Sequence, residues 1–181
     1  ILGRIIARFH KFIVNESDIL VCVSKSVANQ VIRKYKNFKV FLNSLSLEDE
    51  KKIKLINNAQ FRNESKSKLD FYRFIYVGHF DYLKNPKEII DFWIKKDFFN
   101  GRLCLFGRKS NSKYFQEITN LSMLTKNITI NDFKRDIIQE YCFSDIYISA
   151  SRTEGFPNTV IEALCSGCFC LLSDIPPHRE I

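Results

Sequence analysis

Short apolar segments alternate with helix-forming segments along the second half of this 181-residue chain. The apolar segments predict strands at 74–77, 103–106, 128–130, 145–149 and 168–172. Between them the pattern predicts helices that begin at Asn85 and cover 111–124, 134–143 and 158–166. Short apolar strands separated by helices form parallel sheets with both faces covered. The sequence therefore predicts an α/β fold with a Rossmann-like parallel sheet.

The first 70 residues have a different composition, which predicts a separate unit. Their pattern indicates an amphipathic helix over 2–13, strands at 19–23 and 39–42, a helix over 25–36 capped by Ser24, and a helix near 47–60. Residues 44–70 are polar and charged. We therefore divide the chain into 1–45, a linker at 46–70, and a second domain at 71–181. The chain starts without methionine and ends where a helix is about to begin, so we expect an internal fragment of a larger protein.

Composition limits the class of protein. A hydrophobic content of 45% with 17 phenylalanines favours a packed globular protein over a disordered one. The chain has no apolar run of the roughly 18–20 residues that span a membrane. Its six cysteines lie mostly within apolar segments, which is typical of buried thiols in a reducing cytosol. Cys165 and Cys168 have the spacing of a redox or zinc pair, but Gly167 between them is interpreted as a helix C-cap.

The net charge of +8 is uneven. Residues 1–70 carry 14 Lys and Arg against 7 Asp and Glu, whereas residues 71–181 carry 14 against 13. The first part therefore suits an anionic partner such as lipid headgroups, a phosphorylated acceptor or nucleic acid. A solvated lysine-rich surface explains the same charge. Nucleic acid is disfavoured because no strand interleaves stacking aromatic residues with basic ones.

Polar residues follow the ends of the predicted strands. These residues are His79, Lys84, Gly107, 131–133, Glu154 and Asp174. Ligands bind at the carboxyl ends of the strands in open parallel sheets. A ligand site is therefore expected at this edge.

The segment 149–162 is the most informative motif. Glu154 and Glu162 lie eight positions apart, on either side of a turn between a strand and a helix. Pro157 and Asn158 suit the first helical positions. Val160, Ile161 and Leu164 form the predicted apolar stripe, so that Glu162 points away from it. Two carboxylates with helix-start N–H groups between them suit a ligand that is both polyhydroxylated and anionic, such as a sugar nucleotide.

Several motifs together resemble the GT-B glycosyltransferases of family 4. The likeness is densest in Glu154-Gly-Phe-Pro-x4-Glu162-Ala-Leu-x2-Gly167 and in Ser173-Asp-Ile-Pro-Pro-His-x-Glu180. Upstream, Tyr76-Val-Gly-His79 through Lys84-Asn85 resembles the family's phosphate loop, and Leu105-Phe-Gly107 resembles its second strand end. The resemblance covers about residues 19–181. It implies that 71–181 binds the donor nucleotide sugar and that 1–45 ends the acceptor domain.

The resemblance also implies roles for individual residues. Glu162 would bind the ribose hydroxyls, and Glu154 would hold the donor sugar. Lys84, beside Gly78 and His79, would neutralise the leaving diphosphate, while Phe133 and its loop would contact the base. The backbone around the helix start would face the sugar and pyrophosphate, through Gly155, Phe156, Pro157, Asn158 and Thr159. Glu154 and Lys84 are the expected catalytic residues.

The chain departs from the family pattern at two places in the phosphate loop. His79 stands where the family usually has arginine, and Asn85 stands where it usually has glycine. The chain also contains no Asp-x-Asp motif, so no metal and no other cofactor is expected, and Lys84 with helix-end N–H groups would stabilise the leaving group. The resemblance further implies retention of the anomeric configuration.

The expected reaction transfers a sugar from a UDP- or GDP-linked donor to a glycan or lipid-linked acceptor. A Lys-, Asn-, Ile- and Phe-rich composition favours a bacterial source and a role in surface polysaccharide or glycolipid synthesis. The expected location is cytoplasmic, with peripheral contact at the plasma membrane. Two alternatives remain open: a GT-B nucleotide-sugar 2-epimerase, and a basic non-enzymatic protein that binds nucleic acid or membrane.

Overall fold

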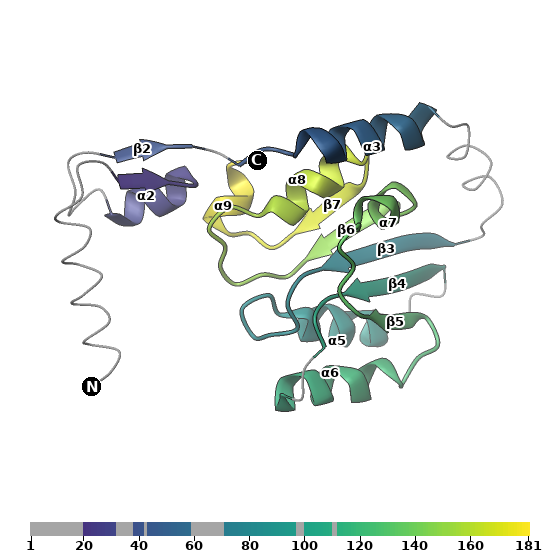
Figure 1. The fold of residues 1–181 in the computed structure, drawn as a ribbon. Coiled ribbons are helices and arrows are strands. Elements are labelled where there is room, and N and C mark those ends of the chain that lie inside the picture. The colour runs from purple at the N-terminus through teal and green to yellow at the C-terminus, as the bar shows by residue number, and fades with distance from the viewer. Residues whose placement is uncertain (1–19, 32–37, 42, 59–70, 97–99, 110–111) are drawn as a thin grey trace, which may run out of the picture.

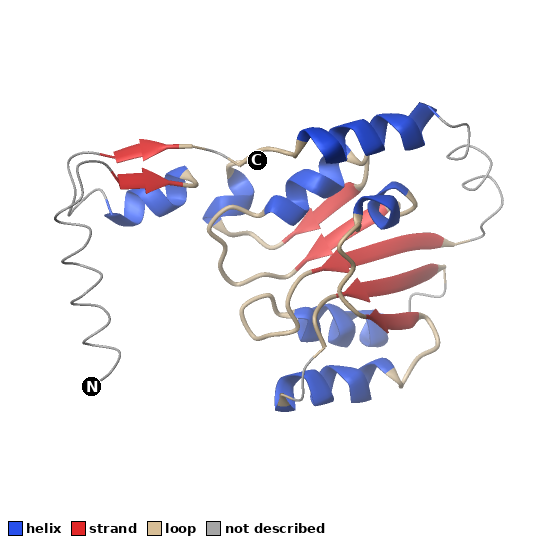
Figure 2. Cartoon of the chain, in the orientation of Figure 1, coloured by secondary structure: helices blue, strands red, loops and turns tan. Residues whose placement is uncertain are grey.

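The computed structural model describes residues 20–31, 38–41, 43–58, 71–96, 100–109 and 112–181. Two parallel sheets are present among them (Figures 1 and 2). The small sheet pairs β1 (Leu20–Cys22) with β2 (Phe38–Val40), and α2 (Lys25–Val31) lies between these strands in the sequence. The amphipathic helix predicted over 2–13 lies outside the described residues.

The large sheet confirms the predicted α/β class. Its strands lie in the order β5-β4-β3-β6-β7, and every neighbouring pair is parallel. The strands are β3 (Tyr72–Val77), β4 (Gly101–Phe106), β5 (Ile128–Asn131), β6 (Ile146–Ser149) and β7 (Phe169–Leu172). Because the chain moves outward from β3 to β5 and then returns to β6, the order reverses beside β3. This reversal is the switch point where doubly wound sheets bind ligands.

Helices cover both faces of the large sheet (Figure 1). One face packs against α3 (Leu47–Asn58), α7 (Ile138–Cys142) and α8 (Asn158–Cys165). The other packs against α5 (Pro86–Lys96) and α6 (Lys113–Ser122). Central strand β3 is apolar on both faces because Ile75 enters the first core, while Phe74 and Tyr76 enter the second.

The predicted helix over 134–143 begins four residues later than expected, at Ile138. Lys134 and Arg135 precede it, and two cations are unfavourable at the positive end of a helix dipole. The Lys134 ammonium instead donates to the Glu140 carboxylate at 2.5 Å. Residues before Ile138 consequently form a loop beyond the end of β5.

Helix α8 has the predicted end and a shifted apolar stripe. Gly167 adopts a positive φ of 80°, the Gly167 N–H donates to the Leu164 carbonyl, and the Cys168 N–H donates to the Ala163 carbonyl. This Schellman arrangement confirms the glycine C-cap. The stripe prediction was wrong at Leu164, whose side chain is 43% exposed, because Val160 and Ala163 form the buried face.

The carboxyl ends of the large sheet face the small sheet and α9 (Pro176–Arg179), as Figure 1 shows. Glu180, directly after α9, accepts hydrogen bonds from the backbone N–H groups of Lys25 and Ser26 at 2.8 and 2.5 Å and from the Ser26 hydroxyl. Burial alone would raise the pKa of Glu180, but these hydrogen bonds together lower it. The Ser24 hydroxyl accepts from the Val27 N–H, which confirms the predicted N-cap.

The division at 1–45, 46–70 and 71–181 remains a prediction. Helix α3 lies in the predicted linker, and its Ile53 joins the core beneath α7 and α8. Within the described ranges, no helix combines the length and apolarity needed to cross a bilayer.

Helix α5 begins with a strained asparagine. Asn85 has a φ of 53° and is buried, and its side-chain amide donates to the Glu88 carboxylate. The Asn85 N–H donates to the Asp81 carbonyl, so Glu88 does not accept from it as it would in a capping box. Asparagine tolerates this left-handed conformation better than other residues that carry a Cβ atom. Asn85 therefore occupies a position with a positive φ, where glycine is the usual residue.

Replacing Asn85 tests this strain. Asn85→Ala keeps a Cβ atom in the left-handed region and loses the contact with Glu88, so we expect a loss of about 1–2 kcal/mol in the free energy of unfolding. Asn85→Gly removes the Cβ atom and should lose less. Urea unfolding of the two variants measures the difference. An alanine variant as stable as the glycine variant would contradict a left-handed Asn85.

Candidate functional site

A cavity of about 310 Å³ opens at the carboxyl edge of the large sheet. It lies at the ends of β3 and β4, beside the switch point, and its size is at the lower end of typical ligand pockets. Its lining comprises Val77, Gly78, His79, Lys84, Phe106, Gly107, Arg108, Phe133, Lys134, Ile137 and Thr159. Gly78, His79, Lys84, Phe133 and Thr159 were predicted site residues, although they span more than 80 positions of sequence.

Two glycines bring the strand ends together at the cavity floor. A Cβ atom on Gly107 would lie 2.1 Å from the Gly78 carbonyl oxygen, a separation that no side chain allows. The Gly78 N–H donates to the Phe106 carbonyl at 3.0 Å, and the Gly107 N–H donates to the Asn131 carbonyl at 3.3 Å. The backbones after β3, β4 and β5 are therefore fixed side by side, and a ligand can approach them closely.

The loop after β3 presents Lys84. The Lys84 N–H donates to the Asp81 carboxylate at 2.8 Å, and the Tyr76 hydroxyl donates to the His79 carbonyl at 2.7 Å. The Leu83 carbonyl accepts from the Arg152 N–H at 2.8 Å, which joins this loop to the loop after β6. Lys84 is thus held by its own loop and by the loop that carries Glu154.

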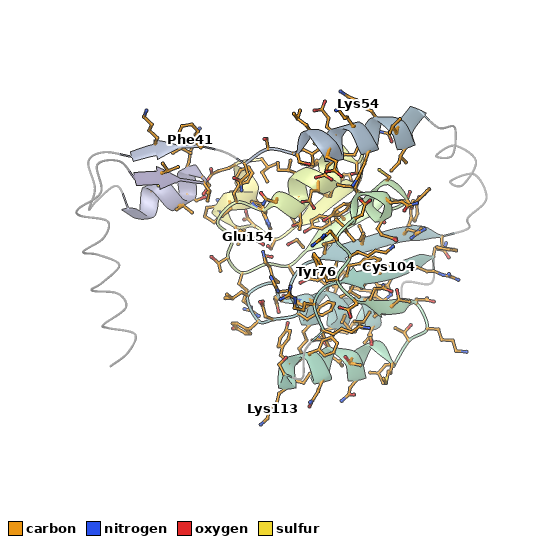
Figure 3. All side chains as sticks on the ribbon, in the orientation of Figure 1. Phe41, Lys54, Tyr76, Cys104, Lys113 and Glu154 are labelled. Atoms are coloured by element: carbon orange, nitrogen blue, oxygen red, sulfur yellow. The ribbon has the colours of Figure 1, made fainter. Side chains whose placement is uncertain are left out.

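Lys84 and Glu154 form an ion pair. The Lys84 ammonium donates to both oxygens of the Glu154 carboxylate, each at 2.6 Å, and the side chains are only 28% and 8% exposed. Figure 3 labels Glu154 at the carboxyl edge of the sheet. Lysine has three N–H donors, so one remains for a ligand in the cavity. The sequence predicted a role for each residue but did not predict that they bind each other.

The turn before α8 is more closely packed than predicted. Pro157 is the buried N-cap of α8 rather than its first helical residue, and the Asn158 N–H donates to the Phe156 carbonyl. The Asn158 side chain accepts from Asn43, while exposed Gly155 lies beside Val23. Of the predicted turn residues, Thr159 alone lines the cavity, where its hydroxyl accepts from the Tyr147 hydroxyl in the core.

Glu162 is not among the described residues that line the cavity. It is one turn beyond Thr159 on α8, and Tyr141 is likewise about one turn beyond Ile137 on α7. Burial raises the pKa of the Glu162 carboxyl, Tyr141 acts in the opposite direction, and the charge of Asp49 raises the pKa further. Within the described part of the chain, the Tyr141 hydroxyl nevertheless has no partner that meets full hydrogen-bond geometry. The two glutamates therefore occupy different surroundings: Glu154 is paired with a lysine, and Glu162 is half-buried near Tyr141.

Two cavity cations were not among the predicted site residues. Arg108 and Lys134 follow the ends of β4 and β5, and the position after a strand end was the signal that could have identified them. Lys134 is paired with Glu140, and Arg108 is exposed. Phe133 is 60% exposed at the same cavity and offers a ring face.

A larger hollow of about 450 Å³ lies at the opposite, amino end of the strands, lined in part by Arg73, Arg102 and Lys126. It contains none of the predicted site residues. Arg73 forms an ion pair with Glu140, and the Arg102 guanidinium lies over the Phe71 ring. Because ligands of parallel sheets bind at the carboxyl edge, we assign the site to the smaller cavity.

Glu162 has a pH signature. A carboxyl group with a raised pKa in the folded state stabilises the fold when protonated, and this contribution disappears as pH rises through the folded pKa. Between about pH 4 and 7, the free energy of unfolding should therefore fall more for the wild type than for Glu162→Gln. Denaturant unfolding across this range measures both profiles. Parallel profiles would show that Glu162 is not buried as described.

Comparison with known proteins agrees with this architecture. The family model for "Glycosyl transferases group 1" matches residues 57–181. A capsular polysaccharide biosynthesis glycosyltransferase, CapH of Staphylococcus aureus, is 29% identical over 144 residues, which are 76% of this chain and 41% of CapH.

Solved structures share the fold. Anabaena HepE, crystallised in complex with UDP and glucose, aligns with a TM-score of 0.72 at 16% identity and covers 91% of this chain and 46% of its own. A glycosyltransferase from Rickettsia africae aligns with a TM-score of 0.68 at 21% identity, over 86% of this chain and 44% of its own. The chain spans less than half the length of these three relatives. Since the family model matches more than half of its residues, the protein belongs to the group 1 glycosyl transferases and has the Rossmann-like architecture of their GT-B fold.

Proposed function

We propose that this chain binds the nucleotide-sugar donor of a glycosyltransferase, with the carboxyl-edge cavity as the donor site. The observation that carries the proposal is the meeting of Lys84 and Glu154 beside that cavity, next to two strand-end glycines. Family membership and the UDP bound to HepE support it. The proposed donors are UDP- or GDP-linked sugars, and the proposed acceptor is a glycan or lipid-linked sugar.

The chemistry assigns separate parts to the two members of the ion pair. When the bond between the anomeric carbon and the leaving diphosphate breaks, negative charge develops on the diphosphate, and the Lys84 ammonium stabilises it. The Glu154 carboxylate accepts hydrogen bonds from donor-sugar hydroxyls while it keeps Lys84 in position. Glu162, about one turn after Thr159 on α8, accepts from the ribose hydroxyls. The Phe133 side chain contacts the nucleobase.

Retention of anomeric configuration and activity without a metal ion belong to the same proposal, on the basis of the motif resemblance and the cationic lining. We further propose a bacterial surface-polysaccharide pathway, to which the name of CapH lends support. The reaction would take place in the cytoplasm, with peripheral contact at the plasma membrane. The division into a chain end at 1–45, a linker at 46–70 and a donor domain at 71–181 is proposed on the composition of these segments.

Calorimetric titration tests the two roles separately. Lys84→Ala should weaken binding of UDP or GDP by about 10- to 100-fold, because charge-assisted hydrogen bonds contribute roughly 1.5–3 kcal/mol. Glu154→Gln should leave nucleoside diphosphate binding unchanged or tighter, since it releases the Lys84 ammonium. It should also abolish the extra affinity for the corresponding nucleotide sugar.

Lys87→Ala is the matched control, because Lys87 is a lysine of α5 that pairs only loosely with Glu117, at 3.5 Å. Circular dichroism confirms that each variant is folded. Binding of diphosphate and nucleotide sugar by Lys84→Ala at the level of Lys87→Ala would refute the assigned site.

A further inference from the structure

Four basic side chains line the cavity: His79, Lys84, Arg108 and Lys134. They come from the ends of β3, β4 and β5, and no carboxylate from the described ranges lines the cavity with them. A concave site with this lining attracts anions. The charge that each side chain can offer to a ligand depends on the partners it already has.

Two of the four are already paired with carboxylates. Lys84 donates to both oxygens of Glu154, and Lys134 donates to Glu140 at 2.5 Å. A phosphate that binds to either ammonium must compete with a carboxylate at hydrogen-bond distance. His79 is a cation only when its ring is protonated.

Arg108 differs from these residues. Among the residues that the structure describes, no carboxylate lies within ion-pair distance of its guanidinium, and the side chain is exposed at the cavity. A guanidinium is permanently charged and presents parallel N–H donors that match two phosphate oxygens at once. Its charge is therefore available in full to an anion in the cavity.

The backbone beneath Arg108 is fixed. Arg108 follows Gly107, which packs against the Gly78 carbonyl so closely that no side chain fits, and the Gly107 N–H donates to Asn131. The start of the Arg108 side chain is thus held beside the loop that carries His79 and Lys84. Such a preorganised donor gives more affinity than one on a loose loop.

We propose that Arg108 binds the diphosphate of the nucleotide and that it gives the site its preference for diphosphates over monophosphates. This inference rests on the proposed donor site. Lys84, tied to Glu154, provides one N–H donor from one side, and Arg108 provides a bidentate contact from the neighbouring strand end. A diphosphate can bind the Lys84 ammonium and the Arg108 guanidinium at the same time, whereas a monophosphate binds only one of these two groups.

The experiment compares Arg108→Ala, Arg108→Lys and the wild type by calorimetry. The titrants are UDP, GDP, ADP and TDP, followed by the monophosphate and the free nucleoside of the base that the wild type prefers. Arg108→Ala should bind the diphosphate about tenfold more weakly, the monophosphate less than threefold more weakly, and the nucleoside equally well. Arg108→Lys should fall between the wild type and Arg108→Ala, because an ammonium keeps the charge without the fork.

Lys109→Ala is the control, because this substitution removes the same charge from the adjacent exposed residue. Lys109 is not among the described residues that line the cavity. Equal diphosphate affinity of Arg108→Ala and Lys109→Ala would overturn the inference while leaving the donor site intact. An equal loss of affinity for the diphosphate, the monophosphate and the nucleoside would contradict the inference, because it would show that Arg108 contacts the nucleobase or supports the fold. A wild type that binds none of the four diphosphates would refute the proposed function itself.

Discussion

The ion pair between Lys84 and Glu154 connects the two loops on which the site depends. The loop after β3 carries Lys84 and the loop after β6 carries Glu154, and β3 and β6 are the neighbours between which the strand order reverses. Backbone pairing of Arg152 with Leu83 reinforces the junction. Since both side chains are largely shielded from water, removing either partner leaves a charge with poor solvation. The Lys84–Glu154 ion pair thus lies at the candidate site and also connects the loops after β3 and β6.

Three features near the candidate site reduce the stability of the fold, and a bound ligand could compensate for them. Asn85 holds a left-handed backbone immediately after Lys84. Glu162 is buried enough for its pKa to rise. Burial raises the pKa of the Tyr141 hydroxyl near Glu162, and among the described residues this hydroxyl has no partner in full hydrogen-bond geometry. Strain, buried charge and unsatisfied polar groups of this kind concentrate at functional sites, because a bound molecule can compensate for them.

The sequence was sufficient for the class of fold, because each strand and helix carries its own periodic signal. Gly167 and Ser24 were predicted as caps because capping depends on residues within a few positions. The sequence also predicted that polar residues gather at the carboxyl edge, since parallel strands place their carboxyl ends together, and a cavity lies at this edge. The start of α7 was misjudged because the periodicity of 134–143 conceals two cations that oppose the helix dipole.

The partners of individual side chains could not be predicted. Lys84 and Glu154 are 70 positions apart, so their bond follows from strand order rather than from spacing. Periodicity placed Glu162 opposite the apolar stripe of α8. Its neighbours Tyr141 and Asp49 come from α7 and α3, and the residues around Glu162 in the sequence do not indicate that these helices pack there. Arg108 was not predicted as a site residue, because its sequence neighbours contain nothing that distinguishes it from Lys109. What distinguishes Arg108 in the structure is that it lines the cavity, directly after the close contact between Gly107 and Gly78.

The most direct test of the donor site is a crystal structure of the chain with the nucleoside diphosphate that binds it most tightly. The phosphates should lie in the cavity beside Gly78, Gly107 and Thr159, within hydrogen-bond distance of the Lys84 ammonium and the Arg108 guanidinium, with the ribose toward Glu162. Phosphates bound elsewhere, such as in the hollow beside Arg73 and Arg102 at the amino ends of the strands, would contradict the account.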